Sequence, residues 1–97
     1  MHEIQEIMGR DRGRELLRYI RSARSALREM DPELEIRGLY PSDCQEQPYW
    51  TANVFTNQAY GNVWPMRDRI RPIANEASSR GIAIVFNFQP KEALAYV

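Results

Sequence analysis

Residues 10–30 read RDRGRELLRYIRSARSALREM, and the periodicity of this stretch decides the fold. At about 100° per residue, its apolar residues fall on one side of a helix and half of the chain's arginines on the other. The apolar side comprises Leu16, Ile20, Ala23, Leu27 and Met30. The basic side comprises Arg10, Arg14, Arg18, Arg21, Arg24 and Arg28, within an arc of roughly 120°. The stretch predicts an amphipathic helix that packs against a core and presents a row of guanidinium groups.

Two strands are predicted after this helix, which Asp31-Pro32 ends because the residue before a proline avoids the α region. Residues 33–40 alternate in polarity, with the apolar side made of Leu34, Ile36 and Tyr40. Residues 49–56 alternate in the same way. One side holds Trp50, Ala52 and Val54, and the other holds Tyr49, Thr51, Asn53 and Phe55. We expect the two strands to pair antiparallel.

The remainder of the chain predicts a second helix and a third strand. Residues 65–79 place Met66, Ile70, Ile73 and Ala77 along one side of a helix that Gly81 ends. Residues 82–89 are β-branched and aromatic, with Phe86 and Phe88 on the core side, and residues 93–97 form a short edge strand if they pair. The fold class is therefore α+β: a two-layer sandwich of order α-β-β-α-β(-β), with a small, mainly antiparallel sheet and two helices on one face.

The length and composition fit a single domain over residues 1–97. The sequence has no run of 18 apolar residues that would predict a membrane span, and its N-terminus has no apolar signal region. We therefore expect a cytoplasmic protein. Residues 2–8 predict a short helical turn. The net charge of zero conceals an asymmetry, since seven arginines stand against two acids over residues 10–28, and six acids against one arginine over residues 29–56. This asymmetry favours an acidic partner or head-to-tail self-association.

The sequence contains no recognisable catalytic, cofactor or metal motif. His2 and Cys44 are the only residues of their types, which disfavours a zinc site and a Cys–His nucleophile, and the five glycines match no phosphate-binding loop. An acid–base pair of Glu33 and Glu35 is one alternative. A solvated face of an edge strand explains these carboxylates better, so we expect a protein that is not an enzyme and binds no cofactor.

The arginine row has three interpretations. It is a solvated helix face, or it binds an acidic protein surface, or it binds the phosphates of nucleic acid. Asp11–Arg14 and Glu15–Arg18 have the (i, i+3) spacing of an intrahelical ion pair, whereas Arg21, Arg24 and Arg28 have no acid at such a spacing within the helix.

Aromatic residues in the middle of the chain add candidate contacts. Trp50 and Tyr40 are expected in the core, and Tyr49 and Phe55 form an expected exposed pair on the other sheet face. Trp64 follows a turn-rich segment, and tryptophan is enriched at binding hot spots.

The leading hypothesis is a small non-enzymatic protein-binding domain of the inhibitor or adaptor type, a class that includes phage-encoded and immunity-type proteins. The alternative is a nucleic-acid-binding domain that contacts phosphates through the same arginines. The predicted partner-binding residues are Arg14, Arg18, Arg21, Arg24, Arg28, Tyr49, Phe55 and Trp64.

Overall fold

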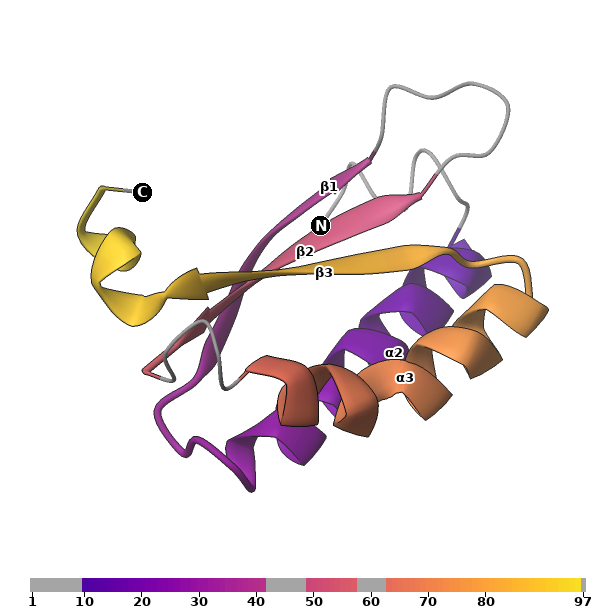
Figure 1. Cartoon of the computed structure of the whole chain (residues 1–97). Helices are drawn as coiled ribbons and strands as arrows, with labels where there is room; N and C mark the ends of the chain where they lie inside the picture. The colour runs from indigo at the N-terminus through magenta and orange to yellow at the C-terminus, as the bar shows by residue number, and fades with distance from the viewer. Residues whose placement is uncertain (1–9, 42–48, 58–62, 97) are drawn as a thin grey trace.

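The computed structural model describes residues 10–41, 49–57 and 63–96, which form two helices packed on one face of a three-stranded sheet (Figure 1). In chain order the elements are α2 (Arg10–Arg28), β1 (Glu35–Pro41), β2 (Trp50–Thr56), α3 (Val63–Ser79), β3 (Ile84–Pro90) and a 3₁₀ helix, η2 (Lys91–Tyr96). This arrangement confirms the predicted α+β class and element order. The predicted helical turn at residues 2–8 lies outside the described residues.

The sheet has the order β1-β2-β3 and is mixed. β1 and β2 are antiparallel, as predicted, whereas β2 and β3 are parallel and are connected through α3. Residues that oppose one another in the sheet form rows across all three strands, such as Tyr40, Thr51 and Val85. Because β2 is the central strand, β1 and β3 are the two edges of the sheet.

The core lies between the helices and the sheet and is made largely of the residues that the helical and strand periodicities selected, with Tyr19 and Val63 in addition. From α2 it takes Leu16, Ile20, Ala23 and Leu27, and from α3 it takes Met66, Ile70 and Ala77. The strands supply Trp50, Ala52, Val54, Phe86 and Phe88. α3 ends at Ser79, and Gly81 terminates it as predicted: the φ of Gly81 is 82°, which is left-handed, and the amide of Ile82 donates to the carbonyl of Ala77 at 2.8 Å.

A bulge in β1 overturns the expectation that Tyr40 belongs to the core. Gly38 has a φ of 74°, and the pairing register with β2 shifts between Arg37 and Leu39. One extra residue exchanges the faces of everything after it, because side chains alternate along a strand. Leu39 therefore packs against the core, and the side chain of Tyr40 is 53% exposed.

The C-terminal segment corrects two further predictions. Residues 91–96 form η2 instead of an edge strand, so the sheet has three strands among the described residues. η2 contacts β2 and β3. Phe55 occupies the sheet face opposite the helices, as predicted, but it is only 1% exposed, and β2, the strand that carries it, contacts η2. Phe55 is therefore not part of an exposed aromatic pair.

The last helical turn of α2 also differs from the sequence prediction. α2 ends at Arg28, and Met30 is exposed, not buried, because it follows the end of the helix and leaves the core stripe. Asp31 is buried instead. Its carboxylate accepts hydrogen bonds from the hydroxyl of Thr56 and from the amides of Glu33 and Asn57, which join the end of α2 to the end of β2.

Candidate functional site

The arginine row of α2 is on the surface, but its members have different surroundings. Arg14, Arg18 and Arg21 are exposed, and we call these three residues the basic face. Arg24 is half-buried. Arg28 donates a hydrogen bond of 2.9 Å from Nε to the carbonyl of Leu34, so it has a structural role in the connection to β1. The predicted row of binding residues thus narrows to the N-terminal half of the helix.

Glu15 belongs to the contact between the two helices and not to the basic face. The predicted ion pair with Arg18 is wrong, because the Glu15 carboxylate pairs with the guanidinium of Arg80 at the end of α3. The hydrogen bond from Arg80 and its positive charge lower the pKa of Glu15. A second contact connects the same helix ends, since Arg12 donates a hydrogen bond of 2.8 Å to the backbone carbonyl of Arg80. These contacts join the start of α2 to the end of α3.

The basic face has no carboxylate partner in the described part of the chain. No ion pair forms between Arg14, Arg18 or Arg21 and any described acid, and the predicted Asp11–Arg14 pair is absent there. The guanidinium carbon of Arg18 instead lies 5.8 Å from the centre of the Tyr19 ring. Arg14 and Arg21 therefore have no acid of the described chain as a partner, whereas the positive charge of Arg18 acts on Glu15 and helps to lower its pKa.

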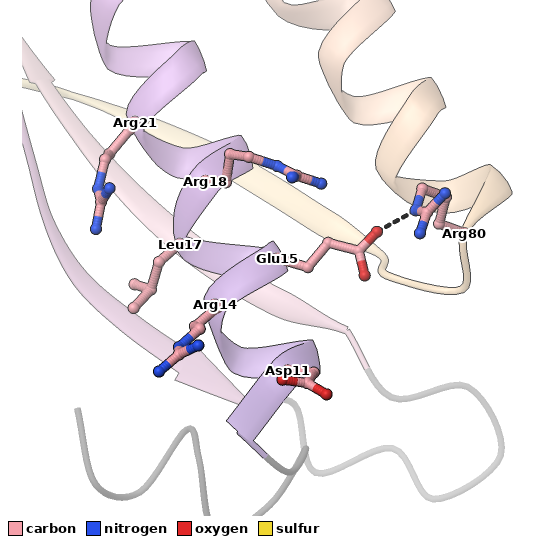
Figure 2. Close-up of a pocket in the computed structure, with 7 residues that line it drawn as sticks. All are labelled: Asp11, Arg14, Glu15, Leu17, Arg18, Arg21 and Arg80. Atoms are coloured by element: carbon pink, nitrogen blue, oxygen red, sulfur yellow. Dashed lines mark hydrogen bonds and ion pairs between the residues drawn. The ribbon is translucent and has the colours of Figure 1, made fainter.

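An open hollow of about 540 Å³ lies along the N-terminal half of α2, and Figure 2 shows the side chains that line it. One side of α2 carries Arg14, Leu17 and Arg21. The other side carries Arg18 and Glu15, and Arg80 of α3 lies next to Glu15 there. Leu17 is half-buried and lies between the two arginines on its side. The lining residues are Asp11, Arg14, Glu15, Leu17, Arg18, Arg21 and Arg80.

The structure does not bring the predicted aromatic contacts to the basic face. Trp64 is 65% exposed and lies at the start of α3. The start of α3 is close to the end of α2, since Arg69 forms an ion pair with Glu29. Tyr49 is 38% exposed and precedes β2, and Phe55 is buried on the far side of the sheet. Trp64 therefore belongs to a second surface, between α3 and β3, which the sequence pattern did not reveal because it depends on strand order.

The acidic alternative receives no geometric support. Glu33 accepts a hydrogen bond of 2.9 Å from the side chain of Asn57 and lies 3.6 Å from the Lys91 ammonium group, whereas Glu35 pairs with Arg37 at 3.0 Å. The two carboxylates thus have separate cationic partners. No cluster of three potential metal ligands occurs within residues 10–41, 49–57 and 63–96. His2 and Cys44 lie outside these ranges.

No protein-family model, no curated protein and no solved structure matches this chain. Among the described helices, none has the length and apolar character needed to cross a membrane.

Proposed function

We propose that this protein is a small non-enzymatic binding domain that presents the basic face of α2 to an acidic surface of a partner protein, in the manner of an inhibitor or adaptor. The observation that carries the proposal is that Arg14, Arg18 and Arg21 are exposed and have no ion-pair partner among the described acids. Guanidinium groups suit such a role because they bind carboxylates with two parallel hydrogen bonds.

The spacing of the basic face indicates what the partner offers. Arg14 and Arg21 are separated by two helical turns, or about 10 Å along the axis, and Leu17 lies between them. A matching surface has two carboxylates at about that separation with an apolar side chain between them. Contact with Leu17 adds burial of apolar area to the charge pairing.

A protein surface fits this site better than the phosphate backbone of nucleic acid. The hollow includes the apolar side chain of Leu17, which gains nothing from contact with a phosphate but can be buried against an apolar side chain of a protein. The chain also has no net positive charge, whereas nucleic-acid-binding domains carry a basic excess. Nucleic acid is therefore the alternative that the experiment must exclude.

The test compares two triple variants that remove the same amount of charge from different surfaces. The first, Arg14→Gln/Arg18→Gln/Arg21→Gln, neutralises the basic face. The control, Arg37→Gln/Arg69→Gln/Arg71→Gln, neutralises three arginines that already pair with acids of the chain. Partners are captured from nuclease-treated lysate of the source organism, purified, and titrated against each protein. We expect the first variant to bind at least about tenfold more weakly than the wild type, and the control to bind within about twofold.

Two results would contradict the proposal. One is equal binding of the purified partner by the wild type and the basic-face variant. The other is tight binding to a duplex DNA probe in which log K falls with log salt concentration by about 0.9 per neutralised phosphate, since that slope is the signature of counterion release.

A further inference from the structure

The two edges of the sheet differ in how well they are protected against pairing with another strand. β1 carries a charged pair, Glu35 and Arg37, and the bulge at Gly38. β3 (Ile84–Pro90) has no charged side chain, and its pairing with β2 is regular throughout. Natural proteins block exposed edges with charges and bulges, and β1 has both devices. β3 has neither, so its outer row of backbone N–H and C=O groups is suitable for strand addition.

A groove runs beside this unprotected edge, between α3 and β3. Its volume is about 380 Å³, and apolar residues of both elements line it, among them Trp64, Ala74, Ile84 and Phe86. Trp64 is among the exposed large apolar residues of the chain, with 65% of its surface accessible. Val85, which is 48% accessible, belongs to the same edge strand and lies on the sheet face away from the helices. Exposed aromatic and branched side chains next to a free strand edge are the elements of a peptide-binding groove.

Arg67 gives the groove a charge preference. Its guanidinium carbon lies 4.9 Å from the centre of the Phe88 ring and 5.9 Å from that of the Trp64 ring. It forms no ion pair with any acid in the described ranges. The aromatic rings orient the planar guanidinium group and leave its N–H groups available to a carboxylate. Arg71, which pairs with Asp68 at 2.8 Å, adds a second positive charge to the lining.

We propose that the β3 edge and this groove bind an extended acidic segment of a partner protein, which adds to the sheet as a fourth strand. The backbone of β3 supplies the ladder of hydrogen bonds, the apolar lining accepts alternate side chains of the segment, and Arg67 pairs with one of its carboxylates. A second copy of this chain is a poorer occupant. Pairing two β3 edges around a two-fold axis would bring Arg67 and Arg71 of both copies to one seam. The inference does not depend on the function proposed for the basic face.

The experiment uses the full chain, labelled with ¹⁵N, and three synthetic peptides. The first is an acidic peptide of alternating glutamate and valine, the second replaces each glutamate with lysine, and the third is the acidic peptide with alternate backbone amides N-methylated. We expect the acidic peptide to shift the amide resonances of residues 84–90 and to slow their hydrogen exchange. The lysine peptide should bind at least about tenfold more weakly, and the N-methylated peptide should not bind, because it cannot form the ladder.

Matched variants assign the binding to the groove. Arg67→Gln should weaken binding of the acidic peptide by at least about fivefold, whereas Arg69→Gln, two residues along the same helix and paired with Glu29, should leave it unchanged. Trp64→Ala should also weaken it. Arg18→Gln on α2 should have no effect, which separates this surface from the basic face.

Three outcomes would overturn the inference. The first is equal affinity for the acidic and lysine peptides, and the second is undiminished binding of the N-methylated peptide. The third is a dimer by sedimentation whose β3 amides are already protected without peptide, since a second copy would then cover the edge.

Discussion

The hydroxyl of Thr56 donates a hydrogen bond of 2.7 Å to Oδ2 of Asp31, and this contact fastens the end of α2 to the end of the central strand. The same oxygen accepts the amide of Asn57 at 2.9 Å, and Oδ1 accepts the amide of Glu33 at 3.2 Å. Asp31 is only 5% exposed, so its charge is retained inside the protein by these three donors. This carboxylate sets the position from which the chain enters β1.

Replacement of Asp31 should therefore destabilise the protein more than replacement of an exposed acid. Asp31→Ala removes the acceptor for three donors, and we expect the free energy of unfolding to fall by about 2–3 kcal/mol in urea denaturation. Thr56→Val removes one donor and should cost about 1 kcal/mol. Asp68→Ala, at an exposed ion pair, should remain within about 0.5 kcal/mol of the wild type. A loss at Asp31 no larger than that at Asp68 would contradict this role.

Stability should depend on pH through the same group. Burial opposes ionisation of Asp31, but hydrogen bonds from Thr56, Asn57 and Glu33 outweigh it and lower the pKa of Asp31 below its ordinary value of 3.8. The folded chain thus binds this proton less readily than the unfolded chain. The stabilisation is complete above the ordinary pKa and is lost as pH falls through the lower folded-state value. Glu15, whose pKa is lowered by its hydrogen bond from Arg80, contributes in the same direction.

Urea denaturation of the wild type and Asp31→Asn between about pH 6 and pH 2 measures this dependence. The difference in unfolding free energy between the two proteins should be constant in the upper part of the range and should shrink toward the acid end. A difference that stays constant to the lowest pH would show that Asp31 has the same pKa in the folded and unfolded chains.

The periodicity of the sequence was sufficient to predict the elements and most of the core, because burial of an apolar stripe is a local property of each segment. Leu16, Leu27, Ile70 and Phe86 are buried as predicted. Tyr40 was misplaced because the effect of a single glycine on strand register depends on the partner strand.

The candidate site was less predictable than the core. Helical spacing alone was sufficient to predict the basic face, and its exposure on α2 is confirmed. Its lack of ion pairs depends on which acid each arginine meets, and Glu15 meets Arg80, 65 residues away. The burial of Phe55 and the groove at Trp64 depend on how η2, β3 and α3 are placed around the sheet, which no local pattern specifies.

Gly38 should resist substitution because of its backbone conformation. Its φ of 74° costs a residue with a side chain about 1–2 kcal/mol, and a Cβ there would also lie 2.6 Å from the hydroxyl oxygen of Tyr40. We expect Gly38→Ala to lower the unfolding free energy by about that amount in urea denaturation. Making the same change in a Tyr40→Ala background separates the two causes, because the contact is then absent. A penalty that disappears in this background would identify the contact, and not the backbone, as its source.

Removal of the Tyr19 hydroxyl, in contrast to the substitution at Gly38, should not destabilise the protein. Its hydroxyl is buried between the elements, and no hydrogen-bond partner for it occurs in the described part of the chain. Tyr19→Phe keeps the ring and removes an unpaired polar atom, so thermal and urea denaturation should show a gain of about 1 kcal/mol. Tyr40→Phe, at an exposed ring, should change stability by less than about 0.5 kcal/mol. A loss at Tyr19 would mean that its hydroxyl is hydrogen-bonded after all.

The basic face should reduce the stability of the helix that carries it. Arg21 is three residues from both Arg18 and Arg24, and like charges at this spacing cost about 0.2–0.5 kcal/mol per pair. Arg21→Gln should therefore raise the unfolding free energy by about 0.5 kcal/mol at low salt, and the gain should disappear near 1 M salt, where the Debye length is about 3 Å. Arg69→Gln, which removes the partner of Glu29, should show no gain. If Arg21→Gln instead destabilises the protein at every salt concentration, the arginine stabilises the fold, and its exposure no longer favours a binding role.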